Sequence, residues 1–176
     1  MKQSVLLFFL FILYSCNTKS SNSSNFADSS IIRSQAMEMS EALVKRNAKL
    51  FIEFHYPKVI EMIGSKEKAI VRIIDTWKEG DRDSIFLIKN TIGNPSKIIK
   101  YKDELQCTIP QSFEYKSKDS RVMVKSTLIA ISLDDGKKWY FVDVFGENIK
   151  KIKSILPNLS KELVIPEQVD PEVIKD

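Results

Sequence analysis

Residues that bind transition metals or form disulfides are scarce in this chain. Its 176 residues include one histidine, His55, and two cysteines, Cys16 and Cys107. Zinc sites draw several ligands together from His, Cys and carboxylates, so we expect no metal site and no cofactor. Cys107 lies in the strand-like run LQCTI, which favours a small buried hydrophobe. As a reactive thiol it would need a nearby base, and His55 is far away in the sequence.

A strong excess of charge of either sign is also lacking. Lys and Arg number 27 and Asp and Glu number 23, which gives a formal net charge of +4. This excess is too mild to indicate a nucleic-acid partner, and we expect none. Lysines gather in residues 97–102 and 150–153. We interpret both groups as solvated faces, with contact to lipid headgroups as the alternative.

No apolar run is long enough to span a membrane. The run Val5–Tyr14 has ten residues, whereas a membrane-spanning helix needs about 20. Its place after Lys2 is typical of a signal-peptide core. The run ends in Leu13–Cys16, which resembles the lipobox of bacterial lipoproteins, where the Cys is acylated and the chain is cut before it. The resemblance implies a signal peptide over residues 1–15 and lipidation of Cys16; the alternative is an incidental Cys after an ordinary secretory signal.

The residues that follow Cys16 are rich in Ser and Asn and poor in apolar side chains. Such a segment cannot bury enough surface to fold, so residues 16–30 predict a lipidated Cys and a flexible tether. Several acyl chains would hold a tethered domain firmly at a membrane. We therefore expect a secreted protein anchored by lipid in the cell envelope, with the outer membrane favoured.

The next part of the chain has helical periodicity. Residues Ser29–Tyr56 predict one long helix with a charged face and an apolar face. Pro57 ends this helix and opens a second one that Gly64 closes. Ser65 caps a third helix, which we expect Gly80 to end.

From Asp83 onward the pattern becomes strand-like. Four runs are rich in β-forming residues: SIFLIKNTIG, YKDELQCTIPQSFEYKS, RVMVKSTLIAISL and KKWYFVDVFG. Pro110 predicts an edge or a bulge in the second run, and DDG predicts a hairpin between the last two. A short helix follows in ENIKKIKSIL. This order indicates an α+β fold. N-terminal helices pack on a curved antiparallel sheet of about four strands, in one domain over residues 31–156, with a loose tail over 157–176.

This order of elements resembles the nuclear transport factor 2-like superfamily of cone-shaped domains. The segments YPKVIEMIG, LQCTIPQ and LIAISLDDGKKWYFVDV are similar to bacterial lipoprotein-type domains in that superfamily whose role is not established. The resemblance implies a ligand site at the mouth of the cone. The superfamily includes isomerases, dehydratases and non-catalytic binding domains, so the fold alone does not define an activity. No isomerase Asp-Tyr-Asp set maps onto this sequence.

Two residues are weak candidates for catalysis. Asp143 interrupts an aromatic strand face, and burial there would raise its pKa and suit it to general-base chemistry or to ligand binding. The alternative is an Asp near a strand end that binds backbone or faces water. His55 is a candidate acid or base because its pKa lies near neutrality. Its place at a helix end favours capping or packing.

Three further residues are candidate ligand-binding groups. Asn47 falls within the apolar stripe of the predicted long helix, where it would bond a ligand or satisfy a backbone group. Gln111 and Tyr115 would point into the cone if they share the face of Leu105, but the register after Pro110 leaves this open.

The expected function is non-catalytic binding of a small apolar ligand or an envelope protein partner. The alternative is an isomerase- or dehydratase-type enzyme that uses Asp143 as base and His55 or Tyr115 to polarise the substrate. A third alternative is a pure interaction module, for which we expect a filled core without a cavity.

Overall fold

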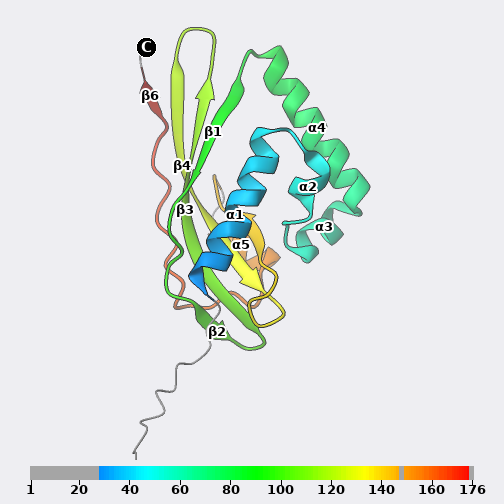
Figure 1. Cartoon of the computed structure of the whole chain (residues 1–176), viewed down its shortest axis with the longest axis vertical. Coiled ribbons are helices and arrows are strands. Elements are labelled where there is room, and N and C mark those ends of the chain that lie inside the picture. Colours follow the sequence, from blue (N-terminus) through cyan, green and yellow to red (C-terminus); the bar gives the residue numbers. More distant parts are fainter. Residues whose placement is uncertain (1–27, 147–148, 175–176) are drawn as a thin grey trace, which may run out of the picture.

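Helices come first along the chain and strands follow, in an α+β fold. The computed structural model describes residues 28–146 and 149–174. The elements labelled in Figure 1 are α1 (Ser29–Val44), α2 (Ala48–Ile52), α3 (Pro57–Ile63), α4 (Lys66–Arg82), β1 (Phe86–Ile92), β2 (Ile99–Tyr101), β3 (Glu104–Lys116), β4 (Arg121–Ser132), β5 (Tyr140–Asp143), α5 (Ile149–Ile155) and β6 (Glu172–Ile174). The predicted signal peptide, Cys16 and the tether up to residue 27 lie outside the described residues.

The single long helix predicted over Ser29–Tyr56 is wrong, because the chain breaks between α1 and α2. Arg46 adopts a left-handed backbone with φ of 57°, and its guanidinium bonds both carboxylate oxygens of Asp81 in α4, at 2.6 and 2.7 Å. Asn47 then caps α2, since its Oδ1 accepts from the Leu50 N–H at 3.2 Å. Asn47 is exposed at this break rather than part of the buried stripe.

Replacing Asn47 with alanine is expected to lower the free energy of unfolding by about 1 kcal/mol, because the first turn of α2 loses its capping oxygen. Urea unfolding of the full chain, followed by circular dichroism, measures the change. Lys49→Ala, at an exposed position in the same helix, is the control and is expected to leave stability nearly unchanged. Equal losses in the two variants would contradict the capping role.

The next two helices begin where the sequence indicates. Pro57 opens α3, Gly64 follows it with φ of 110°, and the Ser65 hydroxyl caps α4 by accepting from the Lys68 N–H at 3.2 Å. The expectation that Gly80 ends α4 is wrong, since the helix continues to Arg82. A Cβ at Gly80 would lie 2.9 Å from the Ile85 carbonyl oxygen. Glycine is needed here because the chain folds back closely onto the helix.

The strands form one antiparallel sheet in the order β1-β3-β4-β5, with β2 paired to β3 and β6 paired to β4. It is curled and cone-like, and α1 to α4 cover its concave face (Figure 1). Side chains of α1, α2 and the strands form the main core there, around the fully buried Trp139. The predicted α+β fold, with N-terminal helices on a curved sheet of about four strands, is confirmed.

Pro110 disturbs the sheet less than predicted. The β3–β4 register runs unbroken through Pro110↔Thr127, and the irregularity lies instead in β1, between Leu87 and Lys89. The Pro110 carbonyl accepts from the Gly93 N–H at 2.8 Å, just beyond the end of β1. The N and C=O of one strand residue face the same neighbour. The missing N–H of Pro110 therefore faces the end of β1, and the β4 ladder stays intact.

The C-terminal segment is packed, so the predicted loose tail is wrong. The chain runs along the sheet and adds β6 beside β4 (Figure 1). Leu159 and Ser160 are buried, and the Ser160 N–H donates to Gln106 Oε1 at 2.9 Å. The Gln106 amide in turn donates to the Asn158 carbonyl at 2.9 Å. Together with α5, this segment covers the convex face of the sheet, where Ile129 and Ile131 are buried.

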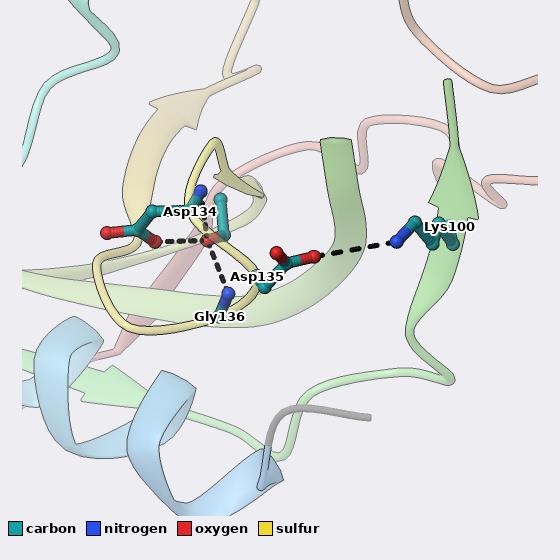
Figure 2. A network of polar contacts seen from close by, with 5 residues as sticks. Lys100, Asp134, Asp135 and Gly136 are labelled. Carbon is teal, nitrogen blue, oxygen red and sulfur yellow. Dashed lines mark hydrogen bonds and ion pairs between the residues drawn. The ribbon is translucent and has the colours of Figure 1, made fainter. Parts of the chain in front are cut away.

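The hairpin predicted at DDG is present between β4 and β5. Its loop is held from within. The Ser132 hydroxyl donates to Asp134 Oδ1 at 2.8 Å and accepts from the Gly136 N–H at 2.8 Å (Figure 2). Asp135 and Gly136 have φ of 57° and 92°, the left-handed region in which Gly and Asp are most often found. Lys100 pairs with Asp135 at 3.5 Å from the neighbouring β2.

Candidate functional site

Four polar side chains cross the otherwise apolar concave face, one from each main strand. They are Asn90 (β1), Gln111 (β3), Ser126 (β4) and Asp143 (β5), and we call them the polar row. Strand side chains alternate between faces, and the pairings Asn90↔Phe113, Gln111↔Ser126 and Leu128↔Asp143 put all four on the core side. The sheet register therefore builds this row from residues far apart in the sequence.

Hydrogen bonds link the row in pairs but leave two buried atoms without a hydrogen bond of ordinary geometry. The Asn90 amide donates to Gln111 Oε1 at 3.3 Å. The Ser126 hydroxyl donates to Asp143 Oδ1, which also accepts from the Phe145 N–H at 3.0 Å. Asn90 Oδ1 is buried without a hydrogen-bond partner in the described structure, and Gln111 Nε2 makes no hydrogen bond of ordinary geometry, although it lies near enough to Asp143 to lower the pKa of that carboxyl group. Such atoms are costly, and a ligand could satisfy both.

Two connected spaces lie in front of the polar row. The first, of about 50 Å³, we call the inner cavity, and it includes Asn90, Gln111, His55 and Asp143 in its lining. The second, of about 660 Å³, we call the outer pocket. It lies between the α1–α2 junction, α4 and the sheet, and its lining is Leu43, Val44, Arg46, Phe51, Ile73, Thr76, Trp77, Glu79, Gly80, Ile85, Leu87, Phe113, Tyr115, Val124, Asp143 and Phe145. Leu43, Phe51, Phe113 and Asp143 belong to both linings, so the two spaces adjoin each other.

Three further hollows lie elsewhere, one of them a shallow hollow of about 510 Å³ on the exposed face of α4. A shallow groove of about 920 Å³ runs between α1 and β1, lined largely by exposed polar and charged side chains. A groove of about 440 Å³ lies between the sheet and the C-terminal segment, near Pro110 and Gln168. None of the three has His55 or Asp143 in its lining, although the groove between α1 and β1 includes Asn90 and the groove near Pro110 includes Gln111 and Ser126. The outer pocket with its inner cavity is therefore the candidate site.

Asp143 is the charged group at the centre of this site. Burial raises the pKa of its carboxyl group, while the Ser126 hydroxyl, the Gln111 amide and backbone N–H groups act in the opposite direction. The residue as a whole is exposed at the end of β5, although protein surrounds its carboxyl group closely enough for burial to raise the pKa. Since it lines both spaces, a small molecule in the pocket can reach it. No cation contributes to its pKa. Its charge is therefore held by hydrogen bonds alone.

His55 lies at the inner end of the site, between α2 and α3. Its Nδ1 lies 3.1 Å from the Phe51 carbonyl oxygen, and its ring meets the Phe51 ring edge-on at 4.6 Å. A carbonyl only accepts, so Nδ1 carries the proton and Nε2 keeps a free lone pair in the neutral ring. Burial lowers the His55 pKa, which favours that neutral ring.

Two more side chains have pKa values that burial raises. Tyr115 lines the outer pocket beside Phe113, with ring centroids 6.1 Å apart, and burial followed by the Asp143 charge raises its pKa. Cys107 is fully buried on the concave face, and burial raises its pKa to about 12. Its thiol is therefore protonated near neutral pH, and the predicted small buried hydrophobe is confirmed.

Four of the five predicted site residues come together. Gln111, His55 and Asp143 line the inner cavity, and Tyr115 joins Asp143 in the outer pocket. Asn47 does not join them, because it is exposed and caps α2. Sequence reasoning missed two members of the polar row. Ser126 stood as one small polar residue within an apolar strand, and the irregularity before Asn90 shifted the alternation in β1.

The raised pKa of Asp143 predicts a pH-dependent effect of Asp143→Asn. The folded state holds this proton more tightly than the unfolded state, so ionisation of Asp143 lowers stability as pH rises from the usual value of 3.8 through the folded pKa. The variant is therefore expected to gain stability relative to wild type on going from below that value to neutral pH. Urea unfolding across this range measures it. Exposed Asp119→Asn corrects for net charge, and a relative gain of equal size there would contradict the prediction.

The described residues contain neither a candidate metal site nor a candidate membrane-spanning helix. No group of three or more His, Cys, Asp or Glu side chains in residues 28–146 and 149–174 is placed to hold a metal ion. None of the helices in the same ranges has both the length and the hydropathy needed to cross a bilayer.

Comparisons with known proteins give no relative. A scan against protein-family models finds no matching family, and searches of curated proteins and of solved structures find no match. The interpretation of the site therefore rests on its own residues.

Proposed function

We propose that this protein is a lipid-anchored component of the cell envelope whose nuclear transport factor 2-like domain binds a small, largely apolar ligand without catalysis. One observation carries the proposal: an open and mostly apolar pocket of about 660 Å³ has the Asp143 carboxyl group, a member of the polar row, in its lining. Pockets of several hundred Å³ with a few polar groups are typical of small-molecule sites.

The size and lining of the outer pocket favour ligand binding over a pure interaction module. That alternative predicts a filled core, whereas the outer pocket has a volume of about 660 Å³. Most of its lining is aliphatic or aromatic, and its polar groups are few: Asp143 and Tyr115 on the sheet side, and Arg46, Thr76 and Glu79 on the helix side. A ligand with an apolar body and one polar end fits this arrangement. The alternative within this proposal is that the domain binds a protein partner at the envelope.

The anchor is the second part of the proposal. It rests on the resemblance of Leu13–Cys16 to a lipobox and on the Ser- and Asn-rich segment behind it. Metabolic labelling with a clickable fatty acid tests it directly. Wild type is expected to become labelled and Cys16→Ser to lose the label. Labelling that persists in Cys16→Ser would contradict lipidation at this residue.

The test of ligand binding is mass spectrometry of molecules held by the full chain, purified from its envelope in a detergent-free polymer extract. A bound molecule is expected in wild type and lost in Leu87→Trp, which places an indole in the outer pocket. Ile88→Trp is the matched control. Ile88 is next to Leu87 in the sequence, but its side chain is 42% exposed and lines the groove between α1 and β1. Identical extracts from wild type and Leu87→Trp would refute the proposal, and membrane lipids common to all three samples cancel.

A second candidate function is catalysis of the isomerase or dehydratase kind. One observation favours it: Asp143 and His55 line the same inner cavity of about 50 Å³. Asp143 would act as base, and the His55 ring or the Tyr115 hydroxyl would polarise the substrate. Turnover by the purified full chain that is lost in Asp143→Asn would replace the non-catalytic proposal with this one.

A further inference from the structure

The charges around the outer pocket are unbalanced toward negative. Its lining holds one cation, Arg46, and that guanidinium is already bound by Asp81 through two hydrogen bonds of 2.6 and 2.7 Å. The carboxylates in the lining are Asp143 and Glu79, and Glu79 pairs with Arg82 at 3.8 Å, so Asp143 is the carboxylate of the lining without an ion pair in the described structure. The nearby His55 is not a substitute cation, because its buried environment favours the neutral ring. A ligand that approaches Asp143 therefore meets a carboxylate without a counter-ion in the pocket lining.

Aromatic rings line the pocket around that carboxylate. Phe51, Trp77, Phe113, Tyr115 and Phe145 come from four different elements or their ends and share one lining with Asp143. Organic cations are attracted to the faces of such rings, and the attraction grows when the site excludes water. Aromatic rings beside a carboxylate are the combination that recognises an ammonium group with an apolar substituent.

We propose that the outer pocket selects organic cations: an ammonium group lies against Asp143 among the aromatic rings, and its apolar body fills the rest of the pocket. The inference rests on the proposed function, since it names the ligand class of the same site. An anionic ligand would place like charge beside Asp143. A neutral alcohol would donate one hydrogen bond to Asp143 but leave its charge unbalanced. An ammonium group donates a hydrogen bond to Asp143 and also balances its charge, and such charge-assisted hydrogen bonds are stronger than neutral ones.

The polar groups of the inner cavity define a second feature of the ligand, next to its ammonium group. Asn90 Oδ1 can accept an N–H from the ammonium, and Gln111 Nε2 can donate to an oxygen next to it. Within the described residues, Asn90 Oδ1 has no other partner, and Gln111 Nε2 has only its interaction with Asp143. An amine with a neighbouring hydroxyl, ether or carbonyl oxygen therefore satisfies more of this site than a simple amine.

The test compares three probes of one shape: phenylbutylamine, phenylbutanol and phenylbutyrate. Each is titrated by calorimetry into the full chain in phosphatidylcholine nanodiscs, and the same discs carrying Leu87→Trp supply the background from membrane partition. The amine is expected to bind about tenfold more tightly than the alcohol, and the acid to bind most weakly. Asp143→Asn, which keeps an oxygen to accept from Ser126, is expected to remove the preference for the amine.

Glu79→Gln is the matched control, because it removes the other pocket carboxylate at an exposed position. It is expected to change the affinity for the amine less than about twofold, since exposed ion pairs contribute little. Equal or tighter binding of the alcohol or the acid overturns the inference, as does an amine preference that survives Asp143→Asn. Binding of none of the probes above the Leu87→Trp background would instead count against the proposed function, so the two failures are distinguishable.

Discussion

Trp139→Ala is expected to lower the free energy of unfolding by about 4 kcal/mol, the cost of deleting a large side chain from a closed core. Trp139 is fully buried in the concave core, and its Nε1–H donates to the Gly136 carbonyl at 3.0 Å. Its backbone N–H donates to Gln35 Oε1 in α1 at 2.8 Å. One residue thus connects the β4–β5 loop, the first helix and the core.

The measurement is urea unfolding followed by far-ultraviolet circular dichroism, which does not depend on Trp139 fluorescence. A loss of about 4 kcal/mol is a large part of the stability of an ordinary domain. Trp139→Phe is the matched variant, because it keeps an aromatic ring and loses the hydrogen bond to Gly136, so a loss of roughly 1–2 kcal/mol is expected. Losses of the same size in both variants would show that the hydrogen bond, and not the ring volume, is what matters.

Much of the fold follows from local sequence signals. Pro57, Gly64 and Ser65 act within one or two turns of chain, and each works where the sequence indicates. The alternation in β3 also holds, and it carries Gln111 and Tyr115 to the concave face with Leu105. The helix starts and ends were predictable because they depend on φ preferences and caps set by neighbouring residues, whereas the register of β3 beyond Pro110 was left open by the sequence.

The break between α1 and α2 was not predictable from local signals. Arg46 is an ordinary helix former, and its left-handed backbone goes with a bidentate bond to Asp81, a residue 35 positions later. Long-range contacts of this kind override helix propensity. The same break moves Asn47 from the predicted site to a helix cap, so one missed tertiary contact explains one missed site residue.

The burial of two polar positions in β3 was also not predictable from local signals. Glu104 and Gln106 alternate with apolar residues, which is the pattern of a strand with one face in water. Both are buried, with exposed fractions of 6% and 0%. The C-terminal segment supplies their partners: Asn158 donates to Glu104 at 3.3 Å, and the Ser160 N–H donates to Gln106 at 2.9 Å. An alternation of polar and apolar residues cannot show whether the polar face meets water or the polar groups of a distant segment of the chain.

Deleting residues 157–176 is therefore expected to lower the free energy of unfolding by on the order of 4 kcal/mol. The deletion removes the buried Leu159 and the half-buried Leu163 and Ile165, and it uncovers Ile129 and Ile131 on the convex face. Full burial of one such side chain contributes about 1.5–3 kcal/mol. Urea unfolding measures the loss. A variant that fails to accumulate as folded protein would also be consistent with a loss of this size.

Deleting only residues 168–176 separates the two roles of this segment. This shorter deletion removes β6, whose Val173 is 65% exposed, but keeps Leu159, Leu163 and Ile165 on the sheet, so a loss of about 1 kcal/mol or less is expected. It also removes Gln168 from the lining of the groove between the sheet and the C-terminal segment, which we call the convex-side groove, and it leaves the outer pocket complete. Similar losses from both deletions would contradict packing by residues 157–167. Unchanged binding of the amine probe in the shorter variant would assign that binding to the concave face, because the convex-side groove is then open.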